Sequence, residues 1–587
     1  RTLVMVLIVL IVLLSTAYAL LRLPMVQTYL TTKLTVQLSE DLNTRVQVGG
    51  VDVGFFNRVI IEELYVEDLS LDTLAYFEKL HLGFNGFDHD SMQVSFGEIR
   101  LDGPKFFLRR LDGENRLNLM FIIDHFQVES DSTAPQWNYD FDELTVHRGS
   151  FQLLDRNKVH NGIGIDYFDL DVRHIELSID DIDIVQDSIY GDIKSLSCFE
   201  TRGFRLDGFK GLAKVSPDMM AVKDIEVQTE KSLVQGDVLF TYTEWRDYLK
   251  FIDNVRMDVK IVPGSILDLK DLSFFAPKLS GIGNDLIISG HVYGTVKSLK
   301  GRNMDIRFAN ATRVQGNVDF DGLPDIDQTF MFLDLKELET NYQDLKTIPI
   351  PPFKEERSLS VPSNVSRLGT IRFSGNFTGF ISDFVAYGKL KTRLGSLRSD
   401  VLLRQDYNTG TLSYSGKLKT ERLDVGTFFG VDSLGRLSLD ASIDGKGLTA
   451  ASIDAQLEGR INQVEIMGYD YKNIDLNGRL FEKRFEGDYS INDENLDMGF
   501  AGVVDFGGDE PYFNFRSTVQ KANLSKLKLL KQREDASIRG DIVFNFVGND
   551  IDELIGNIDM YNITYTEPGH SFKIGNVNFS VSEDEGA

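Results

Sequence analysis

The chain has 587 residues, several times the length of a usual single domain, and its 42% hydrophobic content is enough to build a large apolar interior. Its formal net charge of -27 would repel nucleic acid and anionic lipid headgroups at long range, which excludes polyanion binding. The single cysteine, Cys198, excludes an internal disulfide, and we interpret it as a small apolar side chain.

The N-terminus carries the strongest local signal. Residues 3–21 contain no charged side chain, and as a helix they would span roughly 28 Å, close to the thickness of a bilayer core. We predict an uncleaved transmembrane anchor over residues 1–22. Its anchor residues are Leu3, Val6, Leu10, Leu14 and Leu21. A cleaved signal peptide is the alternative, because Ala17 and Ala19 weakly resemble an A-x-A cleavage site.

Residues 23–44 follow with a helical pattern. Their apolar residues recur every four positions, a spacing that brings them to one side of a helix. These residues are Val26, Leu30, Leu34, Leu38 and Leu42. We predict an amphipathic helix that rests at the membrane surface or plugs the end of a sheet.

From residue 45 onward, short segments alternate apolar and polar residues. In the hairpin-like stretch 303–320, for example, Met304, Ile306 and Phe308 share one side of an extended chain. The 50 glycines and only 13 prolines suit many tight hairpins with few rigid linkers. We therefore predict one long antiparallel succession of strands. Clear alternation occurs at residues 45–53, 93–96, 175–184, 257–262, 436–443, 473–478, 541–547 and 576–582.

Few segments suggest helices beyond the N-terminal region. We expect short helices around Trp245, in the stretch that starts at Thr329, and in the stretch that starts at Asn523. The proline-rich and charged segment 348–364 is the best candidate for an internal boundary or loop.

So many strands with so few helices leave a large apolar surface without an obvious cover. At roughly a dozen residues per strand and turn, the chain holds on the order of 40 strands, which at about 4.8 Å spacing stack to roughly 200 Å. Paired sheets or small barrels are one solution. The other is one long twisted sheet folded lengthwise into a U, a taco-like shape whose inner faces line a hydrophobic groove. We predict this second, all-β fold.

Specific residues resemble a known family. The segment 99–124 resembles the early signature of the AsmA-like and TamB proteins, with an apolar strand, a proline, an arginine, an Asp-Gly turn and an Asn-Leu pair. The residues that carry this resemblance are Pro104, Arg109, Asp112, Gly113, Asn118 and Leu119. Segments 24–68 and 369–404 are similar to the N-terminal part of TamB of the Bacteroidota type.

This resemblance implies a function. AsmA-like proteins, similar in architecture to bridge-like lipid transfer proteins, are single-pass inner-membrane proteins whose U-shaped β groove crosses the bacterial periplasm and carries phospholipid toward the outer membrane. TamB works with an outer-membrane barrel of the BamA or TamA type through a C-terminal domain. We expect that domain to lie outside this sequence, so no residue here is assigned to contact with the barrel.

We expect the groove to occupy residues 45–347 and 365–587, on either side of the proline-rich loop. Acyl chains would move passively along it, and each CH₂ kept from water contributes about 0.8 kcal/mol. The residues predicted to line the groove are Met304, Ile306, Phe308, Val318, Phe320, Leu437, Leu439, Ile542, Phe544 and Phe546. Ordinary sheet packing is the alternative role for each of them.

Signals for catalysis, cofactors or metals are weak. The eight histidines form no HExxH or HxH pair, and no CxxC motif exists, so we predict no zinc site, no cofactor and no enzyme activity. The acidic residues Asp180, Asp181, Asp183 and Asp187 depart from the spacing of a calcium loop, and a solvated strand face explains them better.

Two functions of other classes stay open. One is an assembly factor that helps outer-membrane proteins to fold by strand addition at an exposed sheet edge, together with a BamA-type barrel. The other is a structural or adhesive array of β-sandwiches.

Overall fold

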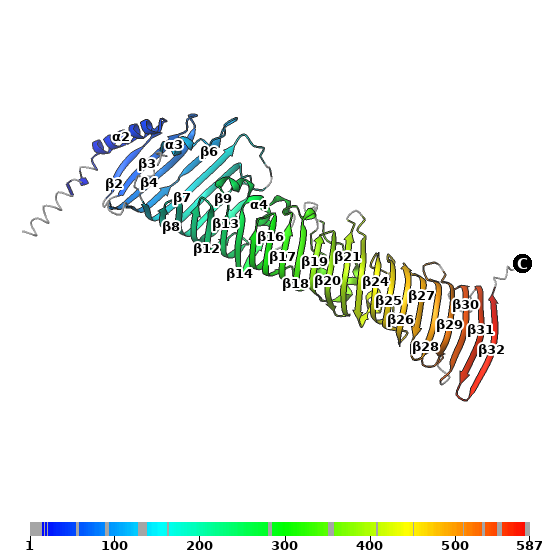
Figure 1. The fold of residues 1–587 in the computed structure, drawn as a ribbon. Coiled ribbons are helices and arrows are strands. Elements are labelled where there is room, and N and C mark those ends of the chain that lie inside the picture. The colour runs from blue at the N-terminus through cyan, green and yellow to red at the C-terminus, as the bar shows by residue number, and fades with distance from the viewer. Residues whose placement is uncertain are drawn as a thin grey trace, which may run out of the picture. The chain divides into compact units, whose positions relative to one another are not determined.

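The computed structural model of the chain consists mainly of strands, with few helices (Figure 1). It describes residues 15–581 except 17, 20–21, 55–57, 89–92, 127–137, 161, 163, 280–284, 350–356, 407–408, 450, 509, 531–534 and 549–554. The chain divides into two compact units, of which the first ends at Gly301 and the second begins at Arg302.

The first unit is built on a mixed sheet. Its strands are β1 (Val46–Gln47), β2 (Gly50–Gly54), β3 (Arg58–Glu67), β4 (Thr73–Asp88), β5 (Gln93–Asp102), β6 (Lys105–Arg110), β7 (Asn138–Asp155), β8 (Asp169–Val185), β9 (Ser188–Glu200), β10 (Phe204–Leu206), β11 (Gly208–Ser216), β12 (Met219–Gln228), β13 (Leu233–Thr241), β14 (Arg256–Asp268) and β15 (Asp285–Gly294). The next strand, β16 (Ser298–Phe308), contains the division between the units.

Strand direction corrects one expectation. Most neighbouring strands are antiparallel, but β7 pairs in parallel with both β5 and β6. Parallel neighbours need a long crossover connection, and residues 111–137 between β6 and β7 provide its length. The prediction of a purely antiparallel succession is therefore wrong in the first unit, because alternation of side chains does not encode strand direction.

The helices of the first unit are short, with one exception. They are α2 (Pro24–Leu42), α3 (Met120–Phe126), η1 (Trp245–Lys250), α4 (Phe251–Asn254), α5 (Leu269–Phe275) and η2 (Pro277–Leu279). The helix predicted around Trp245 is confirmed by η1 and α4.

The helix predicted over residues 23–44 is present as α2, Pro24–Leu42. Pro24 stands at its first turn, where no backbone N–H is needed, and Asn43 ends it in the left-handed conformation. Leu38 and Leu42 pack against the core around Val46, and Leu34 packs against the core around Val51. The helix thus covers the apolar side of the first strands.

A buried polar network holds the N-terminal strands to the α3 region. The Asp68 carboxylate is 1% exposed and accepts hydrogen bonds from the backbone N–H groups of Ser70 and Asp72 and from Asn118 Nδ2, at 2.9, 3.0 and 2.8 Å. Asn118 Oδ1 accepts from the Arg109 N–H at 2.8 Å, and the Arg109 guanidinium forms an ion pair with Asp72. Two residues that carry the family resemblance, Arg109 and Asn118, therefore have a structural role.

The second unit is a single antiparallel sheet with short helical caps. Its strands are β17 (Thr312–Asp321), β18 (Phe330–Thr340), β19 (Ile371–Phe380), β20 (Asp383–Thr392), β21 (Gly395–Gln405), β22 (Leu412–Glu421), β23 (Leu423–Asp424), β24 (Leu434–Lys446), β25 (Asp454–Ile466), β26 (Tyr469–Phe481), β27 (Arg484–Asn492), β28 (Leu496–Asp505), β29 (Tyr512–Asn523), β30 (Ser537–Val547), β31 (Ile555–Glu567) and β32 (His570–Val581). Its helices are η3 (Ile326–Gln328), α6 (Tyr342–Leu345), η5 (Ser363–Leu368) and α7 (Val425–Phe429).

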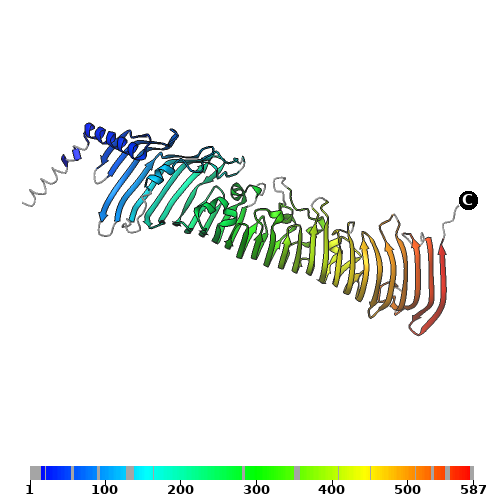
Figure 2. The same ribbon diagram turned by 45° about the horizontal axis from the view of Figure 1, so that its top comes forward.

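Each strand of the second unit pairs with the next along the chain, as the hairpin pattern predicts. The succession runs from β17 to β22, then from β22 to β24, and on to β32, while β23 adds a short second pairing to β24. Figure 2 shows these strands following one another in chain order. Within the described residues of this unit there is one sheet, which does not match two facing sheets of a sandwich.

Two of the predicted helices are wrong. The stretch from Thr329 forms strand β18, and only Tyr342–Leu345 after it is helical. The stretch from Asn523 ends strand β29 and continues as turns. In β18, pairing with β17 and β19 outweighs the helix propensity of its Leu and Lys residues.

The predicted membrane anchor cannot be compared with this fold. Leu3, Val6, Leu10, Leu14 and Leu21 lie outside the described residues. In the part of the chain that is described, no helix combines the length and apolarity needed to cross a bilayer. The structure describes only part of the predicted 348–364 loop. That part is mostly irregular, with an isolated bridge between Pro349 and Ser358 before η5.

We expect Asn118→Ala to lower the free energy of unfolding of the first unit by about 1–3 kcal/mol, because it leaves part of the buried Asp68 carboxylate and the Arg109 N–H without partners. Urea unfolding followed by Trp245 fluorescence measures the change. Asn115→Ala, at an exposed position of the same unit, is the control and should change stability by less than about 0.5 kcal/mol. Equal effects of the two substitutions would contradict a structural role for the network.

Candidate functional site

The candidate site is a continuous face of the second unit, which we call the apolar face. Directly opposed residues in neighbouring strands point to the same side of a sheet, so the register defines rows that cross the strands. The middle row runs Val318, Leu333, Phe377, Ala386, Val401, Gly416, Ile443, Leu457, Gly478, Gly487, Gly502, Phe515, Phe544, Ile558 and Phe579. None of these side chains is charged.

Two further rows flank the middle row, and neither contains a charged side chain. One runs Phe320, Met331, Gly379, Phe384, Leu403, Tyr414, Gly445, Ala455, Leu480, Phe485, Val504, Phe513, Phe546, Gly556 and Val581. The other runs Gly316, Leu335, Gly375, Gly388, Ser399, Leu418, Ala441, Gly459, Leu476, Tyr489, Phe500, Ser517, Ile542, Met560 and Val577.

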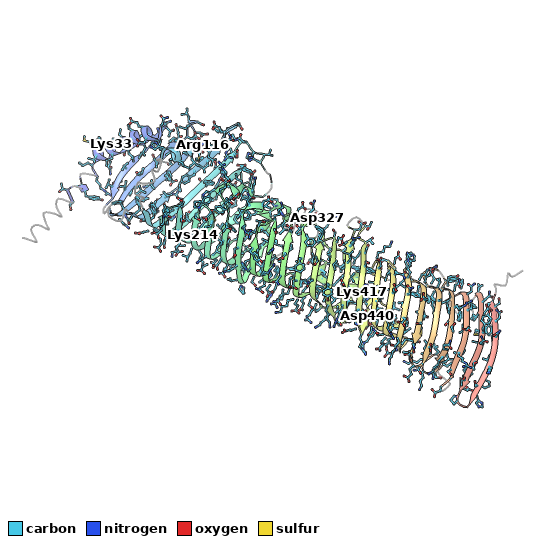
Figure 3. All side chains as sticks on the ribbon, viewed as in Figure 1. Lys33, Arg116, Lys214, Asp327, Lys417 and Asp440 are labelled. Atoms are coloured by element: carbon cyan, nitrogen blue, oxygen red, sulfur yellow. The ribbon has the colours of Figure 1, made fainter. Side chains whose placement is uncertain are left out.

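The opposite face of the same strands carries the charged side chains, together with a few apolar residues such as Phe332, Val385 and Leu402. Lys419 and Asp440, which are directly opposed on β22 and β24, form an ion pair of 2.8 Å. Arg404 and Asp383 form another, of 3.0 Å, between β21 and β20. Figure 3 labels Asp440 among the side chains of this sheet. These pairs are exposed and contribute little stability, but they keep the polar side of each strand in water.

The predicted groove residues of β17, β24 and β30 lie on the apolar face. Val318, Phe320, Ile542, Phe544 and Phe546 are members of the three rows. Leu439 is opposed to Ile461, and Leu437 to Val464, in apolar pairs next to those rows.

The three predicted residues of β16 show the same alternation. Met304 is 4% exposed, and Ile306 and Phe308 are half-buried. Between them, Asp305 accepts hydrogen bonds from Arg313 of β17, at 2.9 Å from Nε. The polar side chains Asp305 of β16 and Arg313 of β17 therefore lie on the same side of the sheet.

The sequence pattern missed other members of the face. Met331, Leu333 and Leu335 belong to β18, which was predicted to be a helix. Leu333 and Leu335 alternate with Asp334 and Lys336, which is the period of a strand, and this short signal was available. Residues such as Phe515 of β29 could have been found in the same way.

The apolar face has dense packing at its two margins. At one margin, the turn that contains Leu524 and Leu527 packs over Val464, Ile491 and Val519. Helix α7 packs against β24 at the same strand ends, next to η5. At the other margin, Leu448 and Ile453 of the loop between β24 and β25 pack around Tyr414 and Ala455.

Between the margins the face keeps contact with solvent. Large side chains of the middle row, among them Leu333, Phe377, Leu457, Phe515 and Phe544, are half-buried. In the described part of this unit, no helix exceeds six residues and no second layer of strands covers the rows. Apolar surface therefore stays available for contact with another molecule.

Glycines in the rows bring the backbone of neighbouring strands close together. Gly478, Gly487 and Gly502 are directly opposed on β26, β27 and β28. The Phe485 ring lies over Gly478, with a carbon 2.6 Å from where a Cβ atom would stand. A glycine covered by an aromatic ring is a known device for shaping and bending sheets.

Aromatic rings follow one another across β27 to β30. The Tyr489 and Phe500 rings stack with centroids 4.5 Å apart, Phe500 and Phe515 are 4.9 Å apart, and Phe515 and Phe544 are 4.6 Å apart. Burial raises the pKa of Tyr489 to about 12. Its ring is therefore neutral at physiological pH, and this part of the face has no charge.

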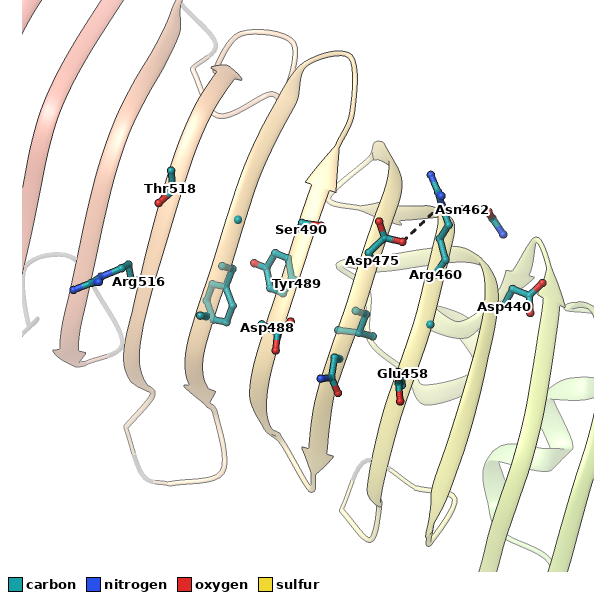
Figure 4. A pocket seen from close by; sticks show the side chains of 16 residues that line it. Asp440, Glu458, Arg460, Asn462, Asp475, Asp488, Tyr489, Ser490, Arg516 and Thr518 are labelled. Atoms are coloured by element: carbon teal, nitrogen blue, oxygen red, sulfur yellow. Dashed lines mark ion pairs between the residues drawn. The ribbon is translucent and has the colours of Figure 1, made fainter.

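A separate hollow of about 820 Å³ lies on the polar face across β24 to β29 (Figure 4). Its lining alternates acidic and basic side chains, including Glu458, Asp475, Asp488, Arg460 and Arg516. Arg460 and Asp475 approach to 4.0 Å, the pair joined by the dashed line in Figure 4. Leu476, Tyr489 and Phe500 of the apolar rows also border the hollow, so its lining is mixed.

The described residues contain no cluster of potential metal ligands. No group of three or more His, Cys, Asp and Glu side chains there could hold a metal ion. Asp180 of the acidic cluster lies on β8, 3.8 Å from Lys194. His147 and His291 each pair with one carboxylate, Glu176 and Asp258 respectively.

Comparisons of the chain with protein-family models, with curated proteins and with solved structures give no significant match. The resemblance to AsmA-like and TamB proteins therefore stays a prediction from the sequence.

We expect Gly502→Ala to destabilise the second unit by more than about 1 kcal/mol, because Gly502 has a φ of +150° and an added Cβ would lie 2.3 Å from the Asn514 carbonyl oxygen. Gly499→Ala is the matched control on the same strand, since its Cβ would meet no atom within 4 Å. Urea unfolding followed by circular dichroism distinguishes the two. A tolerated Gly502→Ala would show that the strands can separate there.

We expect the stability of the second unit to fall as pH rises from about 10 to about 12. Tyr489 has a folded pKa of about 12 against an ordinary value of 10.0, so folding favours its neutral form, and this contribution is complete below pH 10 and lost through the folded pKa. Tyr489→Phe should make the fall shallower. At neutral pH, Tyr489→Phe should leave the free energy of unfolding nearly unchanged, because the Tyr489 hydroxyl has no hydrogen-bond partner among the described residues. An equally steep fall would contradict this assignment.

Proposed function

We propose that the chain carries phospholipid along the apolar face, from the bacterial inner membrane across the periplasm toward the outer membrane. In this proposal residues 1–22 anchor it in the inner membrane, its bulk lies in the periplasm, and an outer-membrane barrel of the BamA or TamA type is the distal partner. The AsmA-like and TamB resemblance supports these assignments.

The observation that carries the proposal is the absence of charge from three adjacent rows. They cross every main strand from β17 to β32, and at about 4.8 Å per strand they extend roughly 70 Å within the second unit. A structural core would need a second apolar layer over these rows. In the described residues the cover is confined to the margins.

The first unit carries a comparable row of its own. It runs Val51, Ile61, Leu80, Leu101, Val146, Leu177 and Leu196. Leu34 of α2 packs at its beginning, beside Val51 and Ile61. Both units therefore offer apolar surface of the kind that acyl chains require.

The energetic argument explains why such a surface would be sufficient. Two acyl chains that leave a bilayer unaided expose many CH₂ groups, each at a cost of about 0.8 kcal/mol, so the barrier is tens of kcal/mol. Uniform apolar contact along the rows removes most of this cost at every position. We propose that the sheet is folded lengthwise into a U around the chains, and that the headgroups stay in water and need no charged pocket.

We expect Leu476→Asp and Phe544→Asp, together, to reduce co-purified phospholipid roughly tenfold or more, because carboxylates on the face exclude acyl chains. Asn477→Asp with Asn545→Asp is the matched control. Each control residue follows its partner by one position, so the same charge is added to the polar face. Mass spectrometry of lipids bound to the detergent-extracted full chain gives the result, and circular dichroism confirms that both variants fold.

Equal lipid content in the two variants would overturn the proposal. Strand addition to outer-membrane proteins would then be favoured, because it uses main-chain groups and is insensitive to charges on the apolar face.

A further inference from the structure

The outer side of helix α2 carries an apolar stripe that the sheet does not cover. Met25 is 84% exposed, Tyr29 is 64% exposed and Val36 is 48% exposed. At 3.6 residues per turn these three residues lie close to one line along the helix. We call this line the outer stripe.

The threonines next to these residues make the stripe less polar than the sequence indicates. Thr28 Oγ1 donates to the Pro24 carbonyl at 2.8 Å, and Thr32 Oγ1 donates to the Thr28 carbonyl at 2.8 Å. Both hydroxyl groups are thus satisfied within the helix. The only charged side chain between Met25 and Val36 is Lys33, which Figure 3 labels on α2.

The helix holds the stripe outward. Its opposite side is fixed on the sheet by Leu34 and Leu38. Near its beginning, Asp52 of β2 accepts from Gln27 Nε2 at 3.0 Å and pairs with Arg22 at 3.3 Å. Rotation that buried the stripe would break these contacts and expose the leucines.

The sequence before the helix indicates what covers the stripe. The uncharged apolar segment 3–21 ends three positions before Pro24, so an anchor there would deliver α2 to the level of the lipid headgroups. A tyrosine and a lysine beside apolar residues are the side chains that this interface favours, because each places an apolar body in lipid and a polar tip in water.

We propose that the outer stripe of α2 is a membrane-contact surface that lies against zwitterionic lipid at the base of the protein. Contact occurs by burial of Met25, Tyr29 and Val36, because the net charge of -27 opposes attraction to anionic lipid. The contact holds the first strands next to the bilayer from which acyl chains would enter. The inner side of α2 stays packed on the sheet. It depends on the predicted anchor and not on lipid passage.

The test uses the full chain in phosphatidylcholine vesicles, with Cys198→Ser as the background. An environment-sensitive fluorophore is attached at Tyr29→Cys or Val36→Cys, and lipids that carry a quencher in the upper acyl region are added. Gln37→Cys is the matched control, since Gln37 is exposed but is turned about 100° around the helix from Val36. Leu10→Cys reports on the anchor itself.

The proposal expects lipid quenching at Tyr29→Cys, Val36→Cys and Leu10→Cys, with much weaker quenching at Gln37→Cys. Quenching at Leu10→Cys alone would overturn the contact and leave the anchor intact. Equal quenching at Gln37→Cys and Val36→Cys would overturn the orientation of the helix. Without quenching at Leu10→Cys, the anchor and the contact both fail.

An aqueous quencher, iodide, separates a protein partner from a membrane. Shielding of Tyr29→Cys from iodide without quenching by lipid would mean that a second copy of the chain or another protein covers the stripe, and it would overturn the proposal. The double substitution Met25→Glu with Tyr29→Glu should abolish lipid quenching at Val36→Cys. Lipid bound along the apolar face, measured in the same preparations, should not change, so failure of this contact is distinguishable from failure of lipid transport.

Discussion

Direct cross-strand register is the constraint on which the second unit depends. A strand exposes alternate residues to its two faces, so a slip of one residue in any pair would bring charged side chains onto the apolar face and apolar side chains into water. The pairs that lead from Val318 on β17 to Phe579 on β32 keep this parity without interruption. Bulges occur in some pairs, but they lie outside the three rows or leave the rows in step.

This constraint explains how a sheet can be stable with little cover. Each strand gains from two neighbours, and apolar packing is concentrated at the margins, around Leu527 on one side and Tyr414 on the other. The centre of the face needs only side chains of low polarity and close backbones, which the row of Gly478, Gly487 and Gly502 provides. The result is a continuous uncharged surface that crosses the strands from β17 to β32.

The N-terminal part of the first unit has a different design. There the apolar side of the first strands is covered by α2. The buried Asp68 carboxylate accepts a hydrogen bond from Asn118, which follows β6 in the sequence. Arg109 and Asn118, which carry the family resemblance, act in this network and do not line the apolar rows. These two residues of the family resemblance therefore stabilise the N-terminal strands. The rows in which we propose lipid transport are defined by the alternation of apolar and polar residues alone.

The sequence by itself determined the side-chain alternation, the helix within residues 23–44, and seven of the predicted face residues, from Val318 to Phe546, that fall in or beside the rows. These features are local, because they depend on a period of two or of about four residues. Only the tertiary structure decided that β7 runs parallel to β5 and β6, that the stretch after Thr329 is a strand, and that cover is confined to the margins. Strand direction and pairing are contacts between distant segments, and a local pattern of polarity is the same for either direction.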